Sequence, residues 1–560
     1  MSFSARPRAL SCLVLFVTLC GAPTRWRPVA TAQAVAGAGA DARPLPRGTV
    51  RMRVAGIWDG YDRTFRADST RPLLSTLRTD AFGVRALPQL TAAQTAIRAL
   101  SGVSAFALSL GTLEASGDAR TVVTPFALDI GVTDRLSIGV VIPYVETRNN
   151  ALFILNRSGT SANVGQNPAF AASGGATARA ANGALLRQLA RSRTQLTAEI
   201  ARCAAVSATN CDAIRANPTG AAQAIALASA TQSAIVAVYG DSVRGGAPVV
   251  PIRSSATQSS IDARIEALRV AFVGFGITSL TSGTLPAAAS IVNGPAAIAR
   301  IARDSAYGLD YETLGGTRRA GIGDIDLTAT YLWLNTLGSR PVQWLAASHV
   351  GVRSQITAGW RFGTAGADRS NDAFDIPIGE GANAMLIRST TDVVVSRRFW
   401  LSGTLRVSQP LADQAMLRRP LLDEANLFVP SVTGRAERTL GRRIEAEIAP
   451  RLVIGQFLGL SAGYVYRRAS SDRYAFAPLA GVEAATTDAA TTVSAPAQSL
   501  QSVLFGVTFS TMSSFVRGRA KWPVEVMFTH AEPLSGSGGV VPAVETDRLE
   551  LRIYSGFPRR

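Results

Sequence analysis

The feature that most constrains the fold is a series of short segments in which apolar side chains occupy every second position. In residues 325–333 the odd positions are apolar or aromatic, while Asp326, Thr328 and Thr330 lie between them. Residues 349–362 and 444–454 repeat the alternation, with arginines and carboxylates opposite the apolar positions. Because successive side chains of a strand point to opposite faces, the pattern predicts strands with one apolar and one polar face.

From Ser104 onward the count is about twelve strands, each long enough to cross a bilayer, which predicts an antiparallel transmembrane β-barrel. Fourteen strands is the alternative if residues 49–103 add a pair. Short connections at 134–135, 397–398 and 455–456 are expected on the periplasmic side, and longer ones near 364–383, 410–441 and 470–497 outside. A soluble β-sandwich also alternates, but two sheets would then have to share the apolar faces.

The amino terminus is typical of a secretory signal peptide, expected over residues 1–32. Arg6 and Arg8 precede the apolar run Ala9 to Ala22, and Ala30-Thr31-Ala32 satisfies a small-residue cleavage rule. An uncleaved anchor is the alternative. Residues 33–103 are expected to form a lead-in or a plug in the lumen, and residues 104–560 the barrel, located in the outer membrane of a Gram-negative bacterium.

Residues 149–319 interrupt the barrel pattern and predict a large, mainly helical loop insertion. Apolar residues there recur at helical spacing in 185–203 and 261–272, which predicts two helices packed as a hairpin. Cys203 and Cys211 are close in sequence in an exported chain, so we expect one local disulfide bond. The uncharged stretches 216–240 and 270–299 leave membrane helices open as an alternative reading.

Charge and residue types exclude several function classes. The net charge is +18, but the arginines are dispersed and form no basic run, so nucleic acid is not an expected partner. With only two histidines, His349 and His530, both placed at strand ends, we expect no metal site, no cofactor and no enzyme activity. Asp324 and Asp326 are interpreted as lumen or rim charges paired with a cross-strand arginine, rather than as a catalytic pair.

The charged positions that alternate with the apolar face are the candidate lumen-lining residues. They are Asp326, Arg353, Arg361, Arg388, Asp392, Arg406, Glu445, Glu447, Arg451, Glu525, Glu550 and Arg552. In a narrow barrel such charges pair and fill the interior, whereas in a wider one they line water and tune permeation.

Three short motifs carry a family resemblance: Asp129 to Leu136 leading to Ile142-Pro143-Tyr144, then Gly321 to Asp324, then Phe374 to Gly381. On these the chain resembles the outer-membrane proteins grouped as the phenol-degradation meta-pathway family. The resemblance implies a barrel and the uptake of small apolar or aromatic compounds. The chain departs from the family in its helical insertion and in its ending Phe557-Pro558-Arg559-Arg560.

The function expected from these observations is a porin-like channel or transporter for small molecules, with outer-membrane lipid and a small solute as its partners. The alternative is a non-conducting barrel that anchors the helical insertion as a surface-exposed domain for an unidentified partner.

Overall fold

The computed structural model describes residues 41–66, 69–158, 161–205, 211–281, 283–338, 350–366, 369–372, 374–419, 433–477 and 492–558. The predicted signal peptide and His349 lie outside these described residues.

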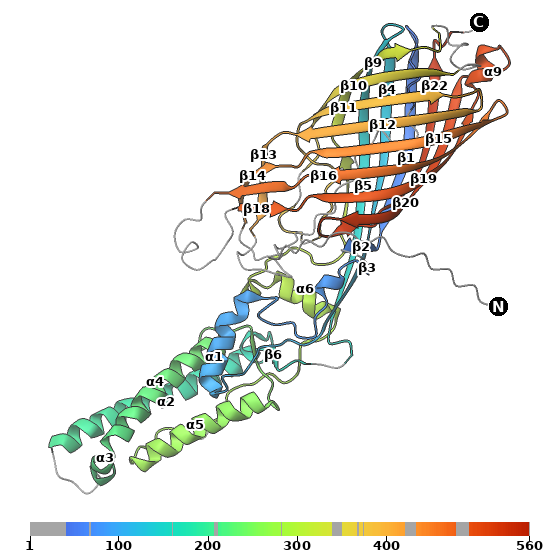
Figure 1. Ribbon diagram of the computed structural model, residues 1–560. Coiled ribbons are helices and arrows are strands. Elements are labelled where there is room, and N and C mark those ends of the chain that lie inside the picture. The colour runs from blue at the N-terminus through green and yellow to red at the C-terminus, as the bar shows by residue number, and fades with distance from the viewer. Residues whose placement is uncertain are drawn as a thin grey trace, which may run out of the picture.

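Twelve antiparallel strands form a closed barrel, which confirms the predicted fold class (Figure 1). The barrel closes because β1 pairs with β22 on one side and with β4 on the other. In chain order the strands are β1 (Val50–Tyr61), β4 (Leu113–Gly131), β5 (Leu136–Leu155), β9 (Ile325–Asn335), β10 (Gly351–Phe362), β11 (Ala384–Val394), β12 (Phe399–Pro410), β15 (Arg443–Ile454), β16 (Leu458–Ala469), β19 (Gln498–Ser510), β20 (Val524–Ser537) and β22 (Glu545–Ser555). A further strand, β8 (Arg318–Ile322), pairs with β5 beyond the stretch of β5 that β9 occupies.

The described part of the expected lead-in or plug, residues 41–103, divides into three pieces. Residues 41–47 lie inside the barrel. Residues 50–61 are a wall strand of the barrel, and residues 73–103 pack outside it. The barrel therefore starts at Val50 rather than at Ser104, although the total of twelve strands is as predicted. The alternation of Val50 to Val54 was visible in the sequence, but the strands flanking it, β4 and β22, are distant along the chain.

The outer surface of the barrel is apolar. Phe126, Leu128 and Ile130 on β4 and Ile138 and Ile142 on β5 are all exposed, and they alternate with buried side chains. A closed barrel satisfies every backbone hydrogen bond between its strands, and an apolar outer band suits the hydrocarbon core of a bilayer. The chain is an outer-membrane barrel.

The two ends of the barrel differ. Turns at 132–135, 395–398 and 455–457 lie at the end that also holds the C-terminus and the start of β1 (Figure 1). The long connections lie at the opposite end. Short turns mark the periplasmic end of such barrels, so we place the long connections outside the cell.

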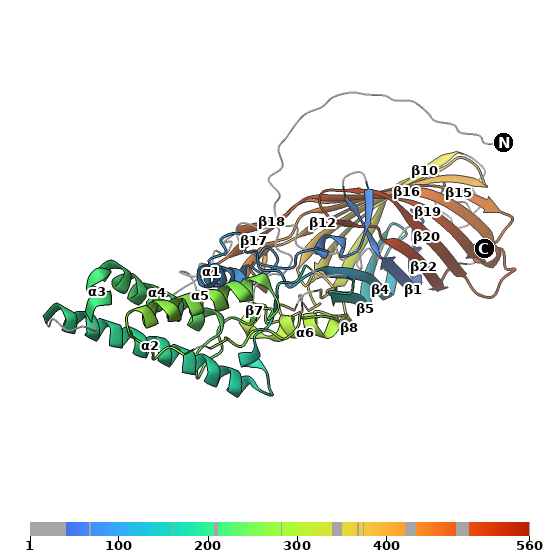
Figure 2. The same cartoon turned by 90° about the horizontal axis from the view of Figure 1, so that it is seen from below.

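Two of those long connections build one helical domain, here called the outer domain, from residues 73–112 and 156–314. Its helices are α1 (Thr91–Ser101), α2 (Gly175–Ala205), α3 (Asp212–Ala216), α4 (Pro218–Val238), α5 (Ala256–Gly274) and α6 (Pro295–Arg303). A single hydrophobic core joins both connections, with Ile97, Leu189 and Ile261 fully buried in it. Figure 2 shows the domain projecting away from the barrel.

The helices of the outer domain follow the predicted periodicity, but their pairing differs from the predicted hairpin. Helix α4 packs against α2 and also against α1 and α5. Among the described residues α4 is the one helix long and apolar enough to cross a membrane, yet its neighbours are these helices. Cys203 at the end of α2 and Cys211 before α3 form a disulfide bond.

The connections expected as loops at 410–441 and 470–497 contain strands. These are β13 (Asp413–Arg418), β14 (Thr433–Thr439), β17 (Asp472–Phe476) and β18 (Thr492–Ala495), which form a separate four-stranded sheet. The remaining short elements are β2 (Arg63–Arg66), β3 (Ser69–Pro72), β6 (Val164–Gln166), β7 (Val249–Pro251), β21 (Val541–Pro542), α9 (Met512–Val516) and the 3-10 turns η2 (Ser75–Leu77), η3 (Pro88–Leu90), η4 (Pro168–Phe170) and η6 (Ser305–Tyr307).

Candidate functional site

All the candidate lumen residues lie on barrel strands with their side chains buried or half-buried, while their apolar neighbours in the strand are exposed. Asp326 is on β9, Arg353 and Arg361 on β10, Arg388 and Asp392 on β11, Arg406 on β12, Glu445, Glu447 and Arg451 on β15, Glu525 on β20, and Glu550 and Arg552 on β22. Because these charges lie on the face opposite the exposed apolar band, the interior of the barrel is polar.

Near the short-turn end, several of these residues contact a segment that precedes β1, residues 41–47. The backbone N–H of Ala42 donates to Asp392 Oδ2 at 2.9 Å, and Arg353 Nε donates to the same oxygen at 2.8 Å. Arg43 forms an ion pair with Glu525 at 2.8 Å. These charges therefore hold a piece of the chain inside the barrel, within the range 33–103 that was expected to form a lead-in or a plug.

Further along β22 the charges pair with one another. Arg552 Nε donates to Glu550 Oε1 at 2.7 Å, and Arg548 forms an ion pair with the same carboxylate. Glu525 lies 3.8 Å from Arg552 and so links this pair to the contact with Arg43. Arg548, which was absent from the predicted set, shares the inward parity of Glu550.

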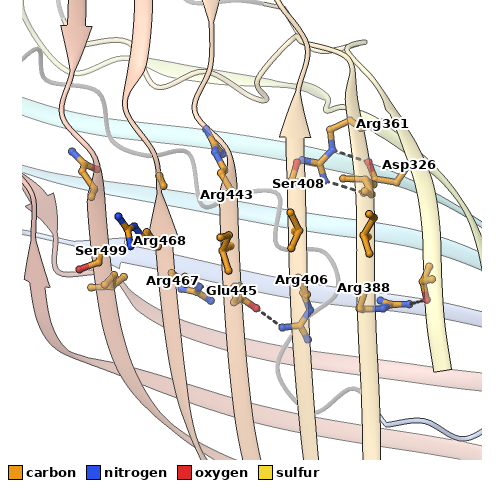
Figure 3. A pocket seen from close by; sticks show the side chains of 18 of the residues that line it. Asp326, Arg361, Arg388, Arg406, Ser408, Arg443, Glu445, Arg467, Arg468 and Ser499 are labelled. Atoms are coloured by element: carbon orange, nitrogen blue, oxygen red, sulfur yellow. Dashed lines mark hydrogen bonds and ion pairs between the residues drawn. The ribbon is translucent and has the colours of Figure 1, made fainter. Parts of the chain in front are cut away.

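A cavity of about 220 Å³ lies in the barrel interior (Figure 3). A row of directly opposed residues crosses four strands at its wall: Arg388, Arg406, Glu445 and Arg467. Arg467 Nε donates to Glu445 Oε2 at 2.8 Å, and Arg406 pairs with Glu445 and, at 3.2 Å, with Glu447. The apolar part of the lining is Val141, Leu386, Leu500, Val541 and Val544.

Asp326 also lines the cavity and lies directly opposite Arg361 on the neighbouring strand. Arg361 donates to both carboxylate oxygens of Asp326, at 2.7 and 2.9 Å. The predicted pairing of Asp326 with a cross-strand arginine is therefore observed, in the bidentate geometry typical of strong Arg–carboxylate pairs.

Asp324 was expected to pair with a cross-strand arginine. Its carboxylate lies near charged side chains, but it also accepts hydrogen bonds from backbone N–H groups, which the strand pattern did not predict. It accepts from Ala365 and Glu380 at 2.9 Å and from Gly381 at 3.3 Å. These contacts fix the β10–β11 connection over the external end of the barrel. They also join two of the sequence motifs, Gly321 to Asp324 and Phe374 to Gly381.

The first motif has a charge role as well. Asp129 on β4 accepts from Arg51 Nε at 3.0 Å and from Arg53 Nε at 2.9 Å, both on β1. Sequence reasoning missed these three residues as inward charges, although Arg51 and Arg53 alternate with Met52 and Val54.

The cavity presents charged and apolar side chains that can bind a small molecule. Its described lining residues include neither histidine nor cysteine, and no cluster of metal-ligating side chains occurs in the described part of the chain. His530 shares the outward parity of the exposed Val526 and Phe528, where it contacts Asp547 at 2.9 Å and Glu532 at 3.4 Å. It is therefore remote from the cavity.

No family model and no curated protein matches this chain. Among solved structures, an outer-membrane channel from Pseudomonas putida F1 is 9% identical, with 92% of this chain and 98% of that chain covered and a TM-score of 0.39. The toluene transporter TodX from Pseudomonas putida is 9% identical, with 96% of each chain covered and a TM-score of 0.25. A FadL homologue from Pseudomonas aeruginosa is 8% identical, with 96% and 99% covered and a TM-score of 0.25. Because these scores are low, the barrel assignment rests on the strand pairing.

Proposed function

We propose that this protein is a channel that carries small molecules across the outer membrane. The observation that carries the proposal is the cavity inside the barrel, which is lined by both charged and apolar residues. A barrel that served only as an anchor would gain most from an interior filled by paired side chains.

The size of the cavity favours a cargo with about one ring. An empty apolar cavity of about 150 Å³ in a protein core is large enough to take up benzene. The cavity here measures about 220 Å³. Single-ring aromatic compounds or short apolar chains are therefore the class of cargo that we propose.

Both ends of the barrel carry chain segments, so passage requires both of them to move aside. Residues 41–47 occupy the lumen near the periplasmic end through the contacts of Asp41 and Arg43. The β10–β11 connection lies over the external end, held by Asp324. We therefore propose ligand-gated rather than continuously open transport.

Conductance of the refolded mature chain in a planar bilayer tests the proposal. The double variant Asp41→Asn with Arg43→Gln removes the ion pairs to Arg451 and Glu525 and should raise the conductance above that of the wild type. Arg47→Gln, on the same segment but with an exposed side chain, is the matched control and should behave as the wild type. Folded barrels that stay silent in all three forms would refute the channel.

A second function, anchoring of the outer domain, is favoured by the size of that domain and by its separate core. Removing residues 156–314 alone would expose the part of the shared core that residues 73–112 supply. The informative variant replaces both segments by short turns. If this variant keeps its permeability but loses surface binding, transport belongs to the barrel and binding belongs to the outer domain.

A further inference from the structure

Arg388 stands out among the arginines of the cavity because no carboxylate of the described residues forms an ion pair with it. Arg388 Nη2 donates a hydrogen bond to Thr357 Oγ1 at 3.3 Å, which is longer than a typical N–H···O hydrogen bond. Its Nε is buried without any hydrogen-bond partner among the described residues. The residue directly opposite it on β12 is another arginine, Arg406, as Figure 3 shows.

The other inward-facing arginines at the cavity each have a carboxylate partner. Arg361 pairs with Asp326, and Arg467 and Arg406 share Glu445. Arg443 pairs with Glu380, and Arg53 with Asp129. Arg468 also borders the cavity, but like the exposed Tyr464 it occupies an outward-facing position of β16.

This arrangement leaves Arg388 as a positive charge at the cavity wall without an ion pair among the described residues. A guanidinium stays protonated in proteins, so Arg388 cannot remove the cost by losing its proton. An unpaired charge away from bulk water is costly, and a like charge opposite adds to that cost. An anion bound beside Arg388 would lower both contributions.

The remaining lining defines the rest of the ligand. Leu386 lies on the same strand two residues before Arg388. Together with Val141, Leu500, Val541 and Val544 it forms the apolar wall of the cavity, whose members are interspersed with the charged residues, since Leu500 lies directly opposite Arg467. The acids at the cavity, Asp326 and Glu445, are each engaged by arginines, which limits their repulsion of an anion.

We propose that the cavity binds small monocarboxylates that carry one apolar ring or a short chain, with Arg388 as the group that receives the carboxylate. A guanidinium can donate two parallel N–H bonds to a carboxylate, while the ring or chain replaces water on the apolar wall. The inference rests on the proposed function, because it names the cargo of the same cavity.

Equilibrium dialysis of the refolded full mature chain in phosphatidylcholine nanodiscs tests the site, with empty nanodiscs subtracted. The probes are benzoate and its neutral analogue benzyl alcohol. We expect the wild type to prefer benzoate by roughly ten- to a hundredfold, the range expected for a charge-assisted hydrogen bond.

The variants separate the role of Arg388 from general charge. Arg388→Gln should abolish the preference for benzoate while leaving the binding of benzyl alcohol unchanged, and Arg388→Lys should keep part of the preference. Arg120→Gln removes an exposed arginine from the outer face of β4 and should change neither affinity. Heat-modifiable migration checks that each variant forms a folded barrel.

Two outcomes would overturn the inference: equal affinity of the wild type for both probes, or an undiminished benzoate preference in Arg388→Gln. Binding is measured here without any transport. Benzoate binding by a barrel without conductance would therefore refute the channel alone, and a conducting barrel without anion preference would refute the site alone.

Discussion

Replacing Asp324 by alanine tests whether one buried carboxylate holds the β10–β11 connection over the barrel. The side chain is 2% exposed and accepts two backbone N–H bonds at 2.9 Å and one at 3.3 Å. At about 1.5 kcal/mol for each of the two shorter bonds, the lower end for a charged acceptor, the loss is about 3 kcal/mol. Since about 1.4 kcal/mol is a factor of ten, local opening of the connection should become roughly a hundredfold more frequent.

Hydrogen exchange followed by mass spectrometry measures this opening at the amides of Ala365, Glu380 and Gly381. The control is Asp118→Ala, an exposed carboxylate on β4 that accepts from Asn150, where we expect a change within about 0.5 kcal/mol. Unchanged exchange at residues 379–381 in Asp324→Ala would refute the reasoning. Equal acceleration in both variants would point to a general loosening of the barrel instead.

The remaining predictions concern the outer domain. Cys203→Ser with Cys211→Ser removes the disulfide bond that closes a short loop, which should lower the stability of the domain by about 2.5 kcal/mol. The midpoint of urea unfolding, followed by helical circular dichroism, measures this loss, and an unchanged midpoint would contradict the prediction. Burial raises the pKa of Asp262 above its ordinary 3.8. The folded domain therefore loses stability as the pH rises above 3.8, because ionising this carboxyl group costs more in the folded state than in the unfolded state. Asp262→Asn should therefore raise the thermal midpoint of the domain at pH 7 and leave it unchanged at pH 3, whereas a lower midpoint at pH 7 would contradict the sign.

The barrel could be predicted because its signal is local. In β9 the alternation of Leu327 and Tyr331 with Asp326 and Thr330 requires only neighbouring residues, and it fixes which face meets lipid. The same logic correctly pairs Asp326 with an arginine of the next strand, since β9 and β10 are adjacent in the barrel.

What depends on distant contacts could not be predicted. Residue 42 meets Asp392 across 350 positions of sequence, and β1 meets β22 near the two chain ends. Asp324 looked like a second lumen charge, because its backbone partners belong to an irregular connection with no periodic pattern. Arg388 was identified as an inward residue, but its lack of a carboxylate depends on which residues three strands bring beside it.

The outer domain and the seam of the barrel together constrain the order of assembly. Both connections that build the domain leave the first strands, β1, β4 and β5, whereas the barrel closes only when β22 pairs with β1. A folded helical domain of this size is too broad for the lumen of a closed barrel of twelve strands. The polypeptide of the domain must therefore be exported while β22 is still unpaired from β1. Pairing of these two strands then closes the opening through which the domain has passed.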